Sequence, residues 1–453
     1  MVLNVTFPLN ALNLNSNLRR ATAAVSLLAA ATATPAQNLV TLYESARGFD
    51  ATYQSARLQF EANVARADQA RAGLLPSVGL GSSVSRTAFA LSNPAVSRDF
   101  NTQGATLSAS QPLYRPANQA AYAQGLKLMA QSRAQLDAAG QDLIVRTSQA
   151  YFDVLAAQDT LAFVQAQKTA VAEQLAFAKR NFEVGTSTIT DTREAQARYD
   201  LVMAQEIAAD NDFRVKKIVL DQLVGRTDAQ PKPLASPFVL PALMPADANA
   251  WVQQADGVHP AIRQALSGLD IAELEVQKAE AGHQPTLDAV ASYNVQRNPT
   301  GTTTLTGASR TNTGSIGLQF NLPLFAGFAI ENRVRETLSL RDKASSDLDF
   351  ARRNVAQGTR TAFFGVLSGQ GQVRALEAAE LSSQSALDAN KLGYQVGVRI
   401  NIDVLNAQSQ LFQTKRDLAQ ARYNVLLGGL RLRQANGTLT ELDLQPVNAL
   451  LTP

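Results

Sequence analysis

Residues 182–191 read FEVGTSTITD and residues 394–403 read YQVGVRINID, so nearly the same ten residues occur twice, 212 positions apart. Both stretches begin with an aromatic residue, carry Val-Gly at their third and fourth positions and end with Asp. A second match keeps almost the same spacing, because QPLY at 111–114 is repeated as LPLF at 322–325. Self-similarity at a fixed offset indicates a repeated structural unit. The sequence therefore predicts one unit written twice.

Composition excludes several classes of function. The net charge is +3 over 453 residues and no run of Lys or Arg exceeds two, so nucleic-acid binding is not expected. There is no Cys, which excludes disulfides, thiolate metal sites and a Cys nucleophile. The only two histidines, His259 and His283, are separate and flanked by loop residues, too few for a metal site. We expect no cofactor and no metal.

The N-terminal residues resemble an export signal. Arg19 and Arg20 precede an apolar stretch at 21–36 that ends in small residues, the pattern of a secretory signal peptide. Cleavage is expected after Ala36, with Ala31-Thr-Ala33 as an alternative site. The alternative reading is an amphipathic first helix. No other segment has about 18 uncharged apolar residues, so no transmembrane helix is expected.

Each predicted unit contains two strands and a long helical hairpin. Apolar and polar residues alternate over 286–296 and 315–324, and more weakly over 78–84 and 105–113, which predicts strands with one apolar face. The polar stretches 92–101 and 297–313 are expected to be the loops between paired strands. In this interpretation each unit reads strand, strand, long helix, turn and returning helix.

Residues 118–184 contain no Pro and carry a heptad pattern that predicts a long coiled coil. Stepping by seven from Leu143 and from Thr147 gives twelve positions, of which ten are apolar. The returning helix of the second unit continues the pattern at Leu411, Leu418, Val425 and Leu432. A helix of this length spans roughly 100 Å.

The domain organisation follows from these patterns. Five prolines at 231, 233, 237, 241 and 245 indicate an external connector between the units. We predict a signal peptide at 1–36, a first repeat at 37–226, a connector at 227–258, a second repeat at 259–437 and a C-terminal tail at 438–453.

Four amphipathic strands are too few to close a barrel, yet strands of about ten residues fit an outer-membrane sheet. An open sheet edge in lipid leaves backbone groups unpaired, so the sheet is expected to close by oligomerisation. Three chains would supply twelve strands around a water-filled lumen. The helices are too polar for lipid and are expected in the periplasm.

The twin Val-Gly turns, the QPLY and LPLF strand ends and the GHQPTLD stretch at 282–288 resemble the TolC family of trimeric outer-membrane channels. The resemblance runs from about Leu39 to the C-terminus. It implies a twelve-stranded β-barrel, a coiled-coil periplasmic barrel and an exit duct for efflux or type I secretion. The implied partners are a periplasmic adaptor, an inner-membrane transporter of the ABC or RND type, and outer-membrane lipid.

The turns supply the candidate functional residues. Gly185 and Gly397 can adopt the left-handed conformation that ends a helix, and Asp191 and Asp403 then fall in the first turn of the next helix, where the dipole favours an anion. Helix capping alone is the alternative explanation for Asp191. The resemblance implies that these tips, with their neighbours Val184 and Val396, meet the partner proteins.

The resemblance also implies a selective entrance and a closed gate. Asp403 matches an acidic ring at the periplasmic entrance, whereas the matching second acidic position is Asn406 here. A trimer would thus carry three charges rather than six at the entrance. The residues that match the bonds holding the tip shut are Asp191, Tyr394 and Arg399.

Two rival functions belong to other classes. A periplasmic coiled-coil adaptor without a pore would need a compact β-domain flanking one hairpin, whereas this chain has two hairpins and separate strand pairs. An exported hydrolase would need a nucleophile beside a base, and the sequence shows no such arrangement. The protein is therefore not expected to be an enzyme.

Overall fold

The structure is a computed structural model that describes residues 37–235 and 238–452. The predicted signal peptide at 1–36 lies outside these residues. The first half contains the helices and strands α1 (Leu39–Phe49), α2 (Ala51–Arg71), β1 (Ser77–Ser92), β2 (Ala95–Tyr114), α3 (Pro116–Glu183) and α4 (Ile189–Val224). The second half contains α5 (Ala248–Val258), α6 (Pro260–Glu280), β3 (Thr286–Asn298), β4 (Ser309–Asn321), α7 (Ala329–Gln395) and α8 (Asn401–Ala435). A short helix α9 (Leu444–Asn448) follows. The two halves share one order of elements, which confirms the predicted repeat.

The strands form one antiparallel sheet in the order β1-β2-β3-β4. Its two faces differ as the alternation predicts. One row across the sheet reads Leu80, Leu107, Tyr293 and Gly314, and a neighbouring row on the other face reads Gly79, Ser108, Ser292 and Ser315. Because β1 and β4 are the outer strands in this order, each has one edge without a partner in the described chain.

The predicted loops between the strands were too long. The β1–β2 connection is only the pair Asn93-Pro94, and residues 95–101 belong to β2. The β3–β4 connection is 299–308, shorter than the expected 297–313. The polar composition misled the prediction because pairing in these hairpin ends needs only backbone groups, and no apolar face is required there.

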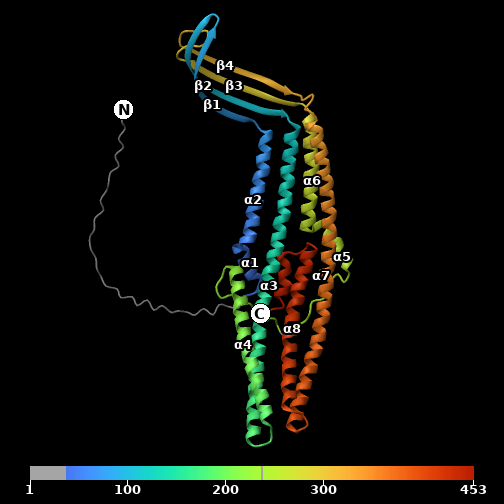
Figure 1. Cartoon of the computed structure of the whole chain (residues 1–453). Helices are drawn as coiled ribbons and strands as arrows, with labels where there is room; N and C mark the ends of the chain where they lie inside the picture. Colours follow the sequence, from blue (N-terminus) through green and yellow to red (C-terminus); the bar gives the residue numbers. More distant parts are fainter. Residues whose placement is uncertain (1–36, 236–237, 453) are drawn as a thin grey trace, which may run out of the picture. The chain divides into compact units, whose positions relative to one another are not determined.

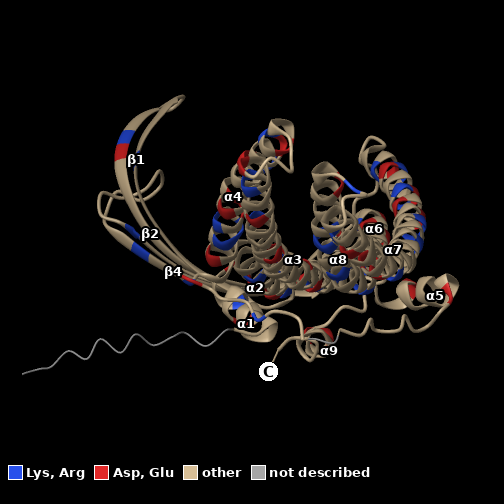
Figure 2. Ribbon diagram, turned by 90° about the horizontal axis from the view of Figure 1, so that it is seen from below, with Lys and Arg blue, Asp and Glu red and all other residues tan. Residues whose placement is uncertain are grey.

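The long helices form two antiparallel hairpins, α3 with α4 and α7 with α8, whose tips lie at the same end (Figure 1). The predicted coiled coil over 118–184 is confirmed, with its heptad residues Val164, Val171 and Leu175 buried against Val202 of α4. Charged residues lie mainly along the helices (Figure 2). Among the described residues, no helix combines the length and apolar character that crossing a membrane would need.

The largest hydrophobic core lies at the middle of the long helices. It joins Tyr151 and Phe152 of α3 to Tyr423 of α8, and the rings of Phe152 and Tyr423 stack with centroids 5.7 Å apart. The C-terminal tail contacts the connector here, through an isolated bridge between Leu234 and Leu451. This core ties α1, α3, α4, α8 and α9 together.

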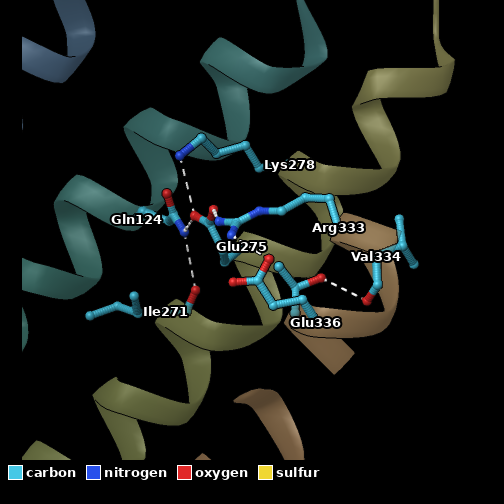
Figure 3. A network of polar contacts seen from close by, with 8 residues as sticks. Gln124, Ile271, Glu275, Lys278, Arg333, Val334 and Glu336 are labelled. Atoms are coloured by element: carbon cyan, nitrogen blue, oxygen red, sulfur yellow. Dashed lines mark hydrogen bonds and ion pairs between the residues drawn. The ribbon is translucent and has the colours of Figure 1, made fainter. Parts of the chain in front are cut away.

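Closer to the sheet than this core, a polar network joins the first repeat to the second repeat (Figure 3). Glu275 of α6 accepts hydrogen bonds from Gln124 of α3 at 2.8 Å and from Arg333 of α7 at 2.6 Å, and Lys278 lies 3.2 Å away. Burial alone would raise the pKa of Glu275, but these bonds outweigh it and lower the pKa. An ionised Glu275 therefore holds three helices from both repeats together.

Candidate functional site at the hairpin tips

Both long helices end in the same way at the tips. Gly185 and Gly397 each have φ of +80°, in the left-handed region that glycine adopts without strain. After α3, the Thr186 amide donates to the carbonyl of Asn181 at 2.8 Å, and after α7 the Val398 amide donates to that of Gly393 at 2.9 Å. These bonds satisfy carbonyls left over at the helix ends. The shared Val-Gly therefore acts as a helix stop.

The first returning helix has a complete N-terminal cap. The Thr188 hydroxyl accepts from the Asp191 amide at 3.3 Å, while Asp191 Oδ2 accepts from the Thr188 amide at 3.1 Å. The same Oδ2 also accepts from the hydroxyls of Thr188 at 3.0 Å and Ser187 at 2.6 Å. Burial alone would raise the pKa of Asp191. These hydrogen bonds lower the pKa by a larger amount, so the net shift is downward. This reciprocal pair is a capping box.

The second returning helix lacks that cap because Ile400 stands where the first has Thr188. Ile400 makes no side-chain cap, and Asp403 is left with a single ionic contact in the described chain, to Arg399 at 3.7 Å. The Asp403 side chain is 34% exposed. The two aspartates thus share a position in the repeat, but the carboxylate of Asp191 is held by hydrogen bonds within its helix cap and that of Asp403 is not.

The two tips are joined by contacts that the sequence did not predict. Asn401 is fully buried, accepts from Gln174 of α3 at 2.5 Å and donates to the main-chain carbonyl of Asp191 at 3.2 Å. Arg198 of α4 donates to Asn406 of α8 at 2.9 Å. The only available signal was the repeat itself, since a polar Asn401 stands where the first copy has Ile189.

The predicted gate residues lie at these tips but do not bond one another within one chain. The ring of Tyr394 packs edge-on against Phe177 at 5.7 Å, and its hydroxyl is buried with no partner among the described residues. Arg399 lies against Asp403, and Asp191 is bound in its own cap. A bond from Tyr394 or Arg399 to Asp191 therefore stays a prediction, one that needs a neighbouring chain.

Each tip exposes a valine beside its glycine, among polar residues in the first tip and beside further apolar residues in the second. Val184 in the first turn is 72% exposed, and in the second turn Val396 is 65% exposed. Val398 and Ile400 extend the second patch. The predicted role of these tips in binding partner proteins stays a prediction.

Comparison with known proteins decides the family. The family described as outer membrane efflux protein matches residues 42–226 and 251–438, which are the two repeats without most of the connector. The chain belongs to the outer membrane efflux protein family. This membership confirms the predicted resemblance and outer-membrane location, with the helical part in the periplasm. It also decides against the adaptor alternative.

Several known proteins are similar to this chain over most of their length. The chain is 32% identical to the outer membrane protein TolC of Vibrio cholerae over 91% of this chain and 94% of that protein. It is 32% identical to the alkaline protease secretion protein AprF of Pseudomonas aeruginosa, over 78% and 73%. The outer membrane channel CmeC of Campylobacter jejuni shares the fold with a TM-score of 0.78 at 18% identity, covering 92% of this chain and 90% of that chain. The fold class predicted from the sequence is confirmed.

Proposed function

We propose that three copies of this chain close a twelve-stranded barrel in the outer membrane and form an exit duct for efflux or type I secretion. The observation that carries the proposal is the four-stranded sheet, which has an apolar face and an opposite polar face. In the described part of the chain, β1 and β4 each have one edge without a partner. In lipid those edges would leave backbone groups unpaired at several kcal/mol each. Pairing β4 of one copy with β1 of the next removes every edge.

The duct receives its cargo through partners at the periplasmic end. The exposed valines of the two tips, Val184 and Val396 beside Gly185 and Gly397, are the surface that we assign to a periplasmic adaptor and an ABC or RND transporter. The similarity to a protease secretion protein supports the secretion role. The proposal involves no catalytic step and no cofactor.

Asp403 is the residue that we assign to charge selection at the entrance. Its carboxylate is partly exposed and lacks a capping hydroxyl, so it can face an ion in the lumen. Asn406, one turn later, adds no charge and is bound by Arg198. A trimer then presents three carboxylates in one ring, each with an Arg399 guanidinium 3.7 Å away, so the cation preference that we assign to the ring is modest.

The closed state is held, in this proposal, by a clasp between neighbouring copies. All three side-chain and amide donors bound to Asp191 use Oδ2, so Oδ1 is available to a residue of the next chain. The exposed Arg399 is the donor that we assign to it, and Tyr394, whose hydroxyl is buried in the single chain, would join the clasp only after its side chain turns outward. Three such clasps, at about 1.5–3 kcal/mol for each charge-assisted bond, would keep the tips together until a partner docks.

Light scattering of the purified protein in mild detergent tests the architecture. The expected result is a trimer that migrates as an SDS-resistant species until heated, together with ion-conducting activity in planar bilayers. A monomer without conductance would contradict the proposal, since the sheet would then keep its open edges.

A further inference from the structure

Two arginines face each other on the apolar side of the sheet. Arg297 of β3 is directly opposite Arg310 of β4 in the antiparallel register. Going down the sheet, the next rows on this face pair Val295 with Asn312 and Tyr293 with Gly314. Both arginines are exposed. A pair of cations thus stands at the hairpin end of a face that is otherwise mainly apolar.

The height of this pair matches the outer boundary of a bilayer. From Leu287, the first apolar residue of β3, to Arg297 are ten residues, which is about 33 Å along a strand. A tilt of about 40° reduces this to roughly 25 Å along the membrane normal, which is the height of the apolar band of outer-membrane barrels. Because the helices occupy the periplasmic end, the two arginines lie at the level of the outer headgroups.

The pair has no counter-charge of its own. Like charges directly opposite each other in a sheet are destabilising. Within the described residues neither Arg297 nor Arg310 forms a salt bridge, and Arg310 donates only to Asn312, at 3.3 Å. Asp99 of β2, four residues beyond the Gln103 that pairs with Arg297, is itself paired with Arg86 at 2.9 Å. The positive charges of Arg297 and Arg310 could therefore be balanced by an anion from outside the protein.

We propose that Arg297 and Arg310 bind a phosphate group of a lipid in the outer leaflet. This inference rests on the proposed placement of the sheet in the outer membrane. Two guanidinium groups side by side match the bidentate geometry of phosphate. The apolar residues below, Tyr293 and Val295, would contact the acyl chains of the same lipid. The site repeats in each copy of the trimer and fixes the barrel at the outer headgroup level.

The test compares lipid binding by native mass spectrometry of the detergent-purified protein. The probes are diphosphorylated lipid A, the same lipid with both phosphates removed, and inorganic phosphate. The variant is Arg297→Gln with Arg310→Gln. The matched control is Arg353→Gln, an exposed arginine on α7 that donates only to the carbonyl of Asp349 in its own helix.

Wild type and the Arg353→Gln control are expected to bind the phosphorylated lipid at least about tenfold more tightly than the dephosphorylated lipid, the effect of one charge-assisted contact. The double variant is expected to lose that preference. Equal binding of both lipids by wild type, or an undiminished preference in the double variant, would overturn the proposal. Displacement of the lipid by millimolar inorganic phosphate would identify a free-phosphate site and overturn the lipid assignment.

Trimer mass and bilayer conductance are measured on the same samples. A conducting wild-type trimer without phosphate preference refutes the lipid site alone. A wild type that neither assembles nor conducts refutes the proposed function, and the lipid site with it.

Discussion

Asp191 and Asp403 occupy the same position in two copies of one turn, but only Asp191 is bound by a helix cap. Its Oδ2 accepts bonds from Ser187 and Thr188, whereas Asp403 has, among the residues described, one ionic contact, to Arg399 at 3.7 Å. The difference arises from two substitutions in the repeat, Arg399 in place of Ser187 and Ile400 in place of Thr188, which remove both hydroxyl donors. Asp191 therefore stabilises its helix end, whereas the carboxylate of Asp403 is not bound in a cap.

Changing Ile400 to Thr should restore a capping hydroxyl to the second tip. We expect the carboxylate of Asp403 to be drawn into a capping box, as that of Asp191 is, and the cation preference of the channel to fall. Reversal potentials in planar bilayers under a salt gradient measure this, and Asp403→Ala sets the lower limit. Ile400→Val, which adds no hydroxyl, is the matched control. A cation preference in Ile400→Thr equal to that of the Val control would count against the assignment.

Replacing Arg399 with Ser and Tyr394 with Phe together should raise single-channel conductance. Both changes remove donors from the proposed clasp, so the tips would separate without a docked partner. Arg353→Ser on the exposed face of α7 is the control and should conduct like wild type. If the double variant also conducted like wild type, the clasp would be refuted and the twin turns would be helix caps only.

The cap of Asp191 should depend on pH. Its pKa is lower in the folded protein than the ordinary value near 3.8, so the stabilisation is complete above that value and is lost as pH falls through the lower, folded pKa. Hydrogen exchange of the peptide covering 186–194, corrected with an unfolded reference, should show full protection at pH 5–7 and less near pH 3. Thr188→Val should reduce protection at neutral pH by removing one cap, about 1 kcal/mol. Protection that is unchanged down to pH 2 would contradict this explanation.

Replacing both Gln167 and Gln408 with Leu should stabilise the protein. Gln174 bonds Asn401 across the α3–α8 contact, and moving one heptad along the antiparallel helices places Gln167 opposite Gln408. Both side chains are over 95% buried and their Oε1 atoms have no partner in the described residues. A buried acceptor without a partner costs about 1–3 kcal/mol, so the unfolding temperature should rise. A fall in that temperature would show that the two amides bond each other or a bound water.

Proline at Val164 should abolish export. Val164 is buried in the α3–α4 seam, and proline in a helix interior costs about 3 kcal/mol or more. Export of a reporter substrate from cells measures the effect, with outer-membrane fractionation to show that the chain still arrives there. Val164→Ala, which keeps the helix, should retain most export. Normal export by the proline variant would remove the coiled-coil duct from consideration.

The sequence by itself determined the repeat, the long coiled-coil helices and the two-faced strands, because each depends on a local period of two or seven residues or on a fixed offset. It also placed the glycine stops correctly, since a left-handed residue after a helix strongly favours Gly. The hairpin loops were misjudged because composition alone does not reveal where backbone pairing stops.

Only the tertiary structure decided what the turn residues contact. No local pattern indicates that Asn401 would reach Gln174 and the carbonyl of Asp191, or that Arg198 would bind Asn406. Nor does periodicity give the register that sets Arg297 opposite Arg310. The contacts at the tips join residues more than 200 positions apart in the sequence. They follow from how whole helices and strands pack, and a local sequence pattern holds no information about that packing.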